Sequence, residues 1–505
     1  MQLREMVETS EAVAATRSRT AKIEAIAATL ARMTPAELAA GAAFLAGEPR
    51  QRRLGVGWAS LRDTPPPAAR PGLTVTDVDA AFERLAALAG SGSQASRAAV
   101  LDSLLAAATA PEQRYLRGLI VGDLRQGALQ SIVTDAVARA AGVPAADARR
   151  ALMLLGDAGE LARIALTEGV EGLRAVRLQV GRPIHPMLAG SAPDLPAAMA
   201  KTGPAALEWK LDGARIQVHR DGSDVGVYTR SLDDVTARVP EVVEAVLALP
   251  GDRLVLDGEA IALRDDGRPH PFQVTGSRFG SSRDVEELRR AIPLTPFIFD
   301  VLHADGDDLL DLPGAERAAH LTRLLPDPMR VPRTVPASEQ EAAVFQREAL
   351  ARGHEGVLVK SLAAPYAAGR RGAGWIKVKP RHTLDLVVLA AEWGHGRRQG
   401  WLSNLHLGAR ADDGRGFVML GKTCKGLTDA LLAWQTERLL ELETSRSGIT
   451  VFVHPELVVE IAFDGLQRSR RYPGGVALRF ARVLRYRDDK RADEADTLST
   501  VLALA

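Results

Sequence analysis

Residues 208–219 read EWKLDGARIQVH and combine a potentially reactive side chain with a clear strand pattern. Lys210 follows a short apolar stretch, and Asp212-Gly213 is a turn signal. RIQVH then alternates apolar and polar residues, and Asp221-Gly222 supplies a second turn before VGVYTR resumes the strand pattern. The pattern predicts a lysine on a turn at the edge of a sheet, exposed on one side and walled on the other. Such an amine can act as a nucleophile. A hairpin whose lysine is simply exposed to solvent is also consistent with this sequence.

Lysine is scarce in this chain. Nine of the 64 basic side chains are lysines, and the rest are arginines. Lysine can lose a proton and become a nucleophile, whereas arginine stays protonated. Because most basic positions in this chain are arginines, the few lysines indicate chemistry that arginine cannot perform. We expect Lys22 and Lys201 to be ordinary surface charges.

Two carboxylates lie in similar settings. Glu259, in LDGEAI, follows an Asp257-Gly258 pair that predicts a turn into a strand, and its carboxylate could point at the same cleft as the lysine. Glu355 and Lys360 bracket the apolar strand of HEGVLVK.

The stretch GWIKVKP carries a pair of lysines. Lys377 and Lys379 are two residues apart on a predicted strand and therefore share a face. Like charges on one face cost stability unless an anion neutralises them, and a polyphosphate is the obvious candidate.

A strongly basic segment lies near the C-terminus, where residues 467–490 read QRSRRYPGGVALRFARVLRYRDDK. Eight Lys and Arg side chains are opposed only by Asp488 and Asp489, a local net charge of +6 in a chain whose formal charge is +1. This concentration indicates contact with phosphates or nucleic acid. A solvated edge strand is the alternative.

The letters GFVMLGKT, residues 416–423, match the phosphate-loop pattern G-x-x-x-x-G-K-[ST]. A working loop of this kind needs a preceding strand and small, flexible residues inside it. Here a turn precedes the motif and its interior, Phe-Val-Met-Leu, is itself a strand pattern. We therefore predict that the match is accidental and that Lys422 holds no phosphate.

Length and composition limit the number of domains and the class of protein. The 505 residues suggest about three domains, and 46% apolar with 25% charged residues is ordinary for globular proteins. The single cysteine, Cys424, excludes a disulfide framework and favours a reducing cytoplasm. No membrane span or signal peptide is evident. We predict a helical domain over residues 1–180, an α+β domain over 181–380 after a proline-punctuated linker, and a small β-barrel over 381–505.

Seven motifs in order carry a family resemblance: KLDGAR, TRS, LDGEAI, FIFD, EGVLVK, WIKVKP and RFARVLRYRDDK. Their order and spacing resemble the covalent nucleotidyltransferase motifs of ATP-dependent DNA ligases. The segment YLRGLIVGDLRQGALQSIVTDAVARAAG is similar to the helical DNA-binding domain of archaeal and bacterial members. The resemblance implies an all-α DNA-binding domain, an α+β adenylation (nucleotidyltransferase) domain and a C-terminal OB-fold β-barrel.

The resemblance also implies a role for each site residue. Lys210 would attack the α-phosphate of ATP and become a lysyl-AMP, with Glu208 facing the adenine and Phe299 stacking on it. Glu259 would serve the ribose or a metal, and Glu355 would support a divalent metal, Mg²⁺ or Mn²⁺. The remaining residues would contact phosphates of the nucleotide, the nick or the leaving pyrophosphate: Arg215, Arg230, Lys360, Arg371, Lys377, Lys379, Arg479, Arg482 and Lys490.

The partner that the resemblance implies is nicked duplex DNA, enclosed by a monomer that acts in the cytoplasm. The family usually has proline where this chain has Ala481, for which we expect only a slightly looser strand. NAD-dependent ligases carry a four-cysteine zinc module that one cysteine cannot build, so ATP is the expected donor. Whether DNA replication, repair or recombination is served, and with which sliding clamp or repair partner, does not follow from the sequence.

Four other functions compete with this interpretation. An RNA ligase or an mRNA-capping enzyme uses the same chemistry, but the helical domain argues against both. If the chain were a phosphate-loop ATPase, its activity would depend on Lys422. A non-catalytic DNA-binding protein would need no ATP.

Overall fold

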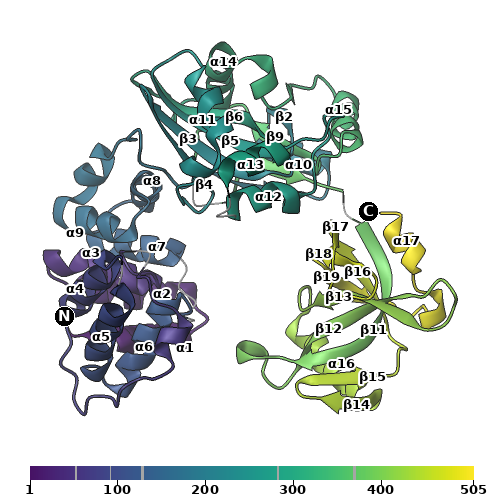
Figure 1. Ribbon diagram of the computed structural model, residues 1–505, viewed down its shortest axis with the longest axis horizontal. Coiled ribbons are helices and arrows are strands. Elements are labelled where there is room, and N and C mark those ends of the chain that lie inside the picture. Colours follow the sequence, from purple (N-terminus) through teal and green to yellow (C-terminus); the bar gives the residue numbers. More distant parts are fainter. Residues whose placement is uncertain are drawn as a thin grey trace. The chain divides into compact units, whose positions relative to one another are not determined.

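The computed structural model describes residues 1–51, 54–90, 92–124, 126, 130–280, 284–367, 371–380 and 382–504. The chain forms two compact units, Met1–Val378 and Lys379–Ala505 (Figure 1).

The first unit begins with a helical region, as predicted. Apolar stripes at helical spacing form its core, which includes Leu3, Phe44 and Phe82. Capping boxes such as Thr34 with Glu37 begin several of the helices. The helices are α1 (Leu3–Ala15), α2 (Arg19–Leu30), α3 (Pro35–Ala46), α4 (Val75–Ala87), α5 (Ser93–Ala106), α6 (Ala110–Val121), α7 (Gln130–Ala141), α8 (Ala145–Leu155) and α9 (Ala158–Ala175). No helix in the parts of the chain that the structure describes combines the length and apolarity needed to cross a membrane.

Lys22 is not a surface charge, so that prediction is wrong. The residue is only 8% exposed, and its Nζ donates a hydrogen bond of 3.1 Å to the carbonyl oxygen of Gln126. Gln126 is itself buried and accepts a hydrogen bond from Ser10 Oγ. A buried carbonyl needs a donor, and here the lysine supplies it.

Two five-stranded sheets follow in the same unit. The first has the order β1-β10-β9-β2-β8 and the second β4-β3-β5-β6-β7. The strands of the first are β1 (Leu188–Ser191), β2 (Ala205–Trp209), β8 (Arg333–Thr334), β9 (Val357–Ser361) and β10 (Arg371–Val378). Those of the second are β3 (Ala214–Asp221), β4 (Asp224–Thr229), β5 (Arg253–Ala262), β6 (Leu294–Ala304) and β7 (Asp307–Asp308).

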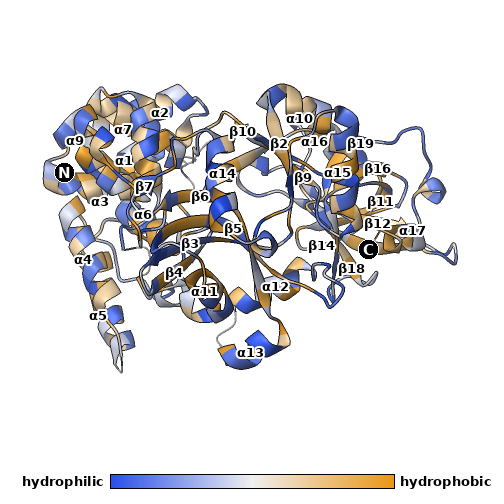
Figure 2. Ribbon diagram, turned by 90° about the horizontal axis from the view of Figure 1, so that it is seen from above, coloured by the Kyte–Doolittle hydropathy of each residue, from blue (hydrophilic) through white to orange (hydrophobic). Residues whose placement is uncertain are grey.

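Helices cover one face of each sheet. Helices α10 (Leu195–Thr202) and α15 (Glu339–Ala351) pack on the first sheet. The second sheet carries α11 (Pro240–Leu247), α12 (Phe272–Gly280) and α14 (Gly314–Leu324). In Figure 2 strands β3 and β5 mix orange and blue, whereas α13 (Val285–Ala291), which buries none of its residues, is mainly blue. The faces left bare by the helices meet each other, since Trp375 of the first sheet packs with Val255 and Leu302 of the second.

The hairpin predicted at Asp221-Gly222 is confirmed, because it joins β3 to β4. The turn predicted at Asp257-Gly258 is wrong, because both residues lie inside β5. A Cβ atom at Gly258 would lie 2.6 Å from the carbonyl oxygen of Phe297, so the glycine permits a close approach of β6 beside a bulge.

The second unit is strand-rich, as expected. Its seven-stranded sheet contains β11 (His382–Trp393), β12 (Leu402–Arg410), β13 (Phe417–Thr423), β14 (Glu443–Ser447), β15 (Thr450–Val453), β16 (Val458–Phe463) and β19 (Arg482–Tyr486). Strands β17 (Gly465–Arg468) and β18 (Val476–Arg479) form a separate hairpin, and the helices are α16 (Asp429–Glu441) and α17 (Leu498–Leu502). Within the described residues, the strand pairings do not join into a closed ring.

The GFVMLGKT stretch is a strand and not a loop. Its residues form β13, and Nζ of Lys422 donates to the carboxylate of Glu392 on β11. The prediction that it lacks phosphate-loop structure is therefore confirmed.

Candidate active site

The register of the first sheet gathers reactive side chains on one face. Ala206 lies opposite Lys360, and Lys360 lies opposite Trp375. Glu208 lies opposite Leu358 on one side and Arg333 on the other. Opposed residues share a face and successive residues alternate, so Glu208, Lys360 and Trp375 point away from the helices. The other face, with Leu207, Val357, Val359 and Ile376, packs against α10 and α15.

Lys210 continues this face beyond the end of β2. Its N–H donates to the carbonyl oxygen of Gly356, and its carbonyl oxygen accepts from the N–H of Glu355, so the ladder extends by one residue. Its Nζ forms an ion pair with the Glu355 carboxylate, and the two side chains are 23% and 17% exposed. The amine is therefore held at the sheet edge, reachable from solvent and beside a carboxylate.

Glu259 comes to the same place from the second sheet. It lies opposite Arg215 on β3 and Phe297 on β6. At Gly213, in the turn after Lys210, a Cβ atom would lie 2.8 Å from Cγ of Glu259. This turn therefore needs glycine, because it packs directly on the carboxylate side chain.

Burial raises the pKa of Glu259 to about 7, and the positive charges of Lys210 and Arg215 counteract part of this effect. The folded chain thus binds the Glu259 proton more tightly than the unfolded chain, where a glutamate has a pKa of about 4.3. Stability contributed by this proton is present below the unfolded pKa and is lost as the pH rises through about 7.

We therefore expect the melting temperature of Glu259→Gln, relative to that of the wild type, to rise as the pH increases from 5 to 8 in the absence of nucleotide and metal. Glutamine cannot ionise, so it escapes the cost that the wild type incurs at high pH. Thermal melts across this range, with Glu348→Gln on the exposed side of α15 as control, measure the difference. A difference that is the same at every pH would contradict the raised pKa.

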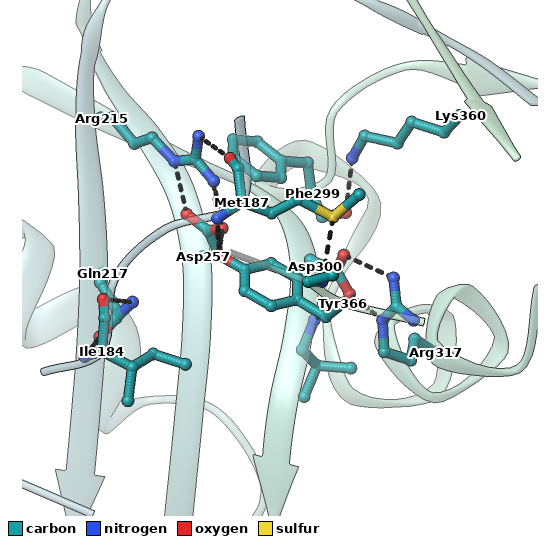
Figure 3. Close-up of polar contacts among 12 residues, drawn as sticks. Ile184, Met187, Arg215, Gln217, Asp257, Phe299, Asp300, Arg317, Lys360 and Tyr366 are labelled. Atoms are coloured by element: carbon teal, nitrogen blue, oxygen red, sulfur yellow. Dashed lines mark hydrogen bonds and ion pairs between the residues drawn. The ribbon is translucent and has the colours of Figure 1, made fainter. Parts of the chain in front are cut away.

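A buried network surrounds Arg215 (Figure 3). Its guanidinium forms two hydrogen bonds with Asp257, of 2.9 and 2.6 Å, and donates a third of 2.7 Å to the carbonyl oxygen of Met187. The hydroxyl of Tyr366 donates to Asp257 at 2.6 Å and accepts from the N–H of Met187. The guanidinium carbon also lies 5.3 Å from the centre of the Phe299 ring. Arg215 thus braces the aromatic ring and the segment that leads into β1.

Glu208 is buried between two cations. Its Oε1 accepts a hydrogen bond of 2.7 Å from Arg333, and its Oε2 lies 2.5 Å from Nζ of Lys360. Lys360 also donates to the carbonyl oxygen of Phe299 at 3.2 Å and lies over the rings of Phe299 and Trp375. Lys360 is thus placed with Glu208 and the aromatic rings, whereas the family resemblance assigns it to phosphates.

The remaining predicted residues of the first unit are more dispersed. Lys377 lies on β10 opposite Leu358, on the face that carries Glu208. Arg371 begins β10, but its side chain lies outside the described residues. Arg230 follows β4 and lines a cavity of about 290 Å³ together with Arg149 and His185.

In the second unit, acidic partners offset part of the predicted positive charge. Lys490 and Arg487 both donate to Asp385, at 2.6 and 2.7 Å, and Arg485 pairs with Glu460. Lys379 lies 3.6 Å from Asp464. Arg482 is exposed at the start of β19, and Arg479 ends β18.

Sequence reasoning missed Arg333, Asp257, Tyr366 and Trp375. Asp257 stands in the same LDGEAI motif as Glu259, and reading Asp257-Gly258 as a turn concealed it. Trp375 begins the WIKVKP motif, of which only the two lysines were assigned a role. Arg333 and Tyr366 lie outside the seven motifs, and their partners are far away in the chain: Arg333 meets Glu208, 125 residues before it.

The described residues contain no group of three or more His, Cys, Asp or Glu side chains that could hold a metal ion. Magnesium, however, is commonly bound by one or two carboxylates together with substrate phosphates. Glu259 and Glu355 lie close enough for each charge to affect the other, and they are oxygen donors. These two residues therefore fit a divalent ion that a nucleotide helps to hold.

Comparison with known proteins accounts for most of the chain. The sequence matches the family "ATP dependent DNA ligase domain" over residues 186–379, "ATP dependent DNA ligase C terminal region" over 398–490 and "DNA ligase N terminus" over 60–138. It is 61% identical to a "Probable DNA ligase" of Nocardioides sp. strain JS614, over 98% of this chain and 97% of the relative. A protein of the same name from Anaeromyxobacter sp. strain Fw109-5 is 58% identical over 100% of this chain and 98% of its own.

A solved structure supports the fold. "Pmar-Lig_PreS3" superposes with a TM-score of 0.61 at 17% identity, and the match covers 95% of this chain and 99% of that one. The match therefore extends over nearly all of the fold described above. The curated relatives extend the likeness to sequence over nearly the full length. The chain belongs to the ATP-dependent DNA ligase family and is a DNA ligase enzyme.

Proposed function

We propose that this chain seals nicks in duplex DNA, joining a 3′-hydroxyl to a 5′-phosphate with ATP through a lysyl-AMP and a DNA-adenylate. The observation that carries the proposal is the contact of Lys210 with Glu355, on a face shared with Glu208, Lys360 and Lys377. A lysine amine beside a carboxylate and further cations suits attack on a polyphosphate.

In the first step, the neutral amine of Lys210 attacks the α-phosphorus of ATP. A nitrogen–phosphorus bond forms, the bond to the β-phosphate oxygen breaks, and pyrophosphate leaves. Glu355 forms an ion pair with Nζ and offers an acceptor for the proton that the amine must lose. Rate enhancement then comes chiefly from positioning and charge neutralisation.

Other side chains hold the nucleotide and the leaving group. Glu208 faces the adenine, Phe299 stacks on it, and Glu259 serves the ribose or a metal. Lys360 lies with Glu208 and the aromatic rings, and Arg215 is bonded to Asp257, so both line the nucleotide site rather than its phosphates. The cations that we assign to phosphates are Arg371, Lys377 and Lys379, with Arg479, Arg482 and Lys490 on the pyrophosphate. Glu259 and Glu355 would hold Mg²⁺ or Mn²⁺, which supplies charge neutralisation at the phosphates.

In the second step, the 5′-phosphate at the nick displaces Lys210 from the AMP, and a phosphoanhydride forms. In the third, the 3′-hydroxyl attacks the DNA phosphorus and AMP leaves, which completes the phosphodiester. Arg230 contacts the nick phosphate. Neither step needs base recognition, so we expect contacts to the sugar-phosphate backbone and strong salt dependence.

For the architecture we propose domains over residues 1–180, 181–380 and 381–505, the last an OB-fold barrel. Rotation about residues 379–385 would bring the basic strand of the barrel over ATP for the first step and release it for DNA. The division of the chain between Val378 and Lys379 supports a hinge there. A monomer would then enclose the duplex. Crosslinking the barrel to the core should slow at least one step, and normal rates for all three would contradict the rotation.

The test is sealing of a singly nicked duplex with ATP and Mg²⁺, with DNA or RNA on both sides of the nick. We expect sealing of the DNA nick at least about tenfold faster than that of the RNA nick. Faster sealing of RNA would make the chain an RNA ligase. Absence of any sealing, by protein shown to be folded, would overturn the proposal.

A further inference from the structure

Arg333 holds one oxygen of the buried Glu208 carboxylate. The two residues lie directly opposite each other in the β2–β8 ladder, and Nη1 donates to Oε1 at 2.7 Å. The Glu208 side chain is 3% exposed and that of Arg333 is 25% exposed. A buried carboxylate needs charged or hydrogen-bonding partners, and β8 brings this one to the edge of the sheet.

The second oxygen of Glu208 lies on the side of the Phe299 ring. Lys360 Nζ is 2.5 Å from Oε2 and 4.4 Å from the centre of that ring. Lys360 forms an ion pair with Oε2, which is a buried oxygen. A carboxylate oxygen can accept more than one hydrogen bond, so Oε2 keeps capacity for a donor on a ligand beside Phe299.

An oriented carboxylate distinguishes the two purines. Adenine carries an exocyclic amine, which donates to a carboxylate, where guanine carries a carbonyl oxygen, which a carboxylate repels. The discrimination depends on where the carboxylate oxygen points, because a freely turning side chain can move away from the guanine oxygen. A site that pairs buried polar groups with one ligand rejects the ligand that leaves them unpaired.

We propose that Arg333 is a positioning residue that fixes Glu208 for adenine and thereby sets selectivity for ATP over GTP. The inference rests on the proposed function, which places the adenine between Glu208 and Phe299. Arg333 acts through Glu208 and needs no contact with the nucleotide. Lys360 cannot replace it, because its Nζ also donates to the carbonyl oxygen of Phe299 and lies on the Oε2 side.

The experiment measures transfer of labelled nucleotide from ATP and from GTP to the full chain over a range of concentrations. The variants are Arg333→Met, which removes the donor, Arg333→Lys, which keeps the charge, and Arg347→Met, an exposed α15 arginine, as control. For Arg333→Met we expect the KM for ATP to rise about tenfold while kcat stays within about threefold. The ratio of kcat/KM for ATP to that for GTP should fall by about tenfold, and Arg333→Lys should recover part of it.

Melting curves of each variant establish that it is folded, and Glu208 keeps Lys360 as a partner when Arg333 is absent. An unchanged KM and an unchanged ATP-to-GTP ratio in Arg333→Met, with normal labelling of the wild type, would overturn the role of Arg333 alone. Equal losses with both nucleotides would also overturn it, since they indicate a merely structural contact. Failure of the wild type and of Arg347→Met to take label from ATP would instead overturn the proposed function.

Discussion

Replacing Lys210 with arginine is expected to reduce sealing with ATP by at least about a thousandfold. Arginine keeps the positive charge opposite Glu355, so the fold should be retained, but a guanidinium does not give up its proton to attack phosphorus. The third step breaks no bond to this residue. Sealing of a nick that already carries a 5′-adenylate should therefore stay within about tenfold of the wild type.

The matched control is Lys201→Arg, an exposed lysine at the end of α10, which should seal normally with ATP. Gel assays on the two substrates, ordinary nick and pre-adenylated nick, separate the steps. Equal losses on both substrates would mean that Lys210 contributes something other than the nucleophile.

Replacing Asp257 with alanine is expected to destabilise the first unit by about 3–5 kcal/mol. The Asp257 side chain is fully buried, and it is bonded to Arg215 and to the Tyr366 hydroxyl. Its loss leaves the guanidinium of Arg215, itself only 16% exposed, without a countercharge. Urea unfolding, followed by tryptophan fluorescence, measures the fall in stability.

Two further variants test the cause. Asp252→Ala, in an exposed acidic position next to β5, should change stability by less than about 0.5 kcal/mol. The double variant Asp257→Ala with Arg215→Met removes both charges and should be more stable than Asp257→Ala alone. A double variant as unstable as the single one would show that the cost comes from lost packing rather than from a stranded charge.

Local patterns predicted the parts of the molecule that depend on neighbouring residues. Alternation in RIQVH and the Asp221-Gly222 turn predicted β3 and its hairpin with β4, and helical spacing predicted the N-terminal helices. The scarcity of lysine marked Lys210, Lys360 and Lys377 as candidates. The β2–β9–β10 register and the backbone hydrogen bonds of Lys210 place all three on one face.

Contacts between distant residues could not be predicted in this way. The local sequence predicts a surface charge at Lys22, because its partner, the buried carbonyl oxygen of Gln126, lies 104 residues along the chain. Asp257-Gly258 has the letters of a turn, but pairing on both sides makes it the middle of a sheet. The charge of residues 467–490 is likewise moderated by Asp385 and Glu460, which belong to other strands.

The measurement that tests the central claim most directly is the intact mass of the protein after incubation with ATP and Mg²⁺, for the wild type and Lys210→Arg. Protein first shown to be free of bound AMP should gain the mass of one AMP in the wild type and none in the variant. Adding nicked DNA should then remove that AMP. No gain in either protein, or an equal gain in both, would contradict the assignment of Lys210 as the nucleophile of a DNA ligase.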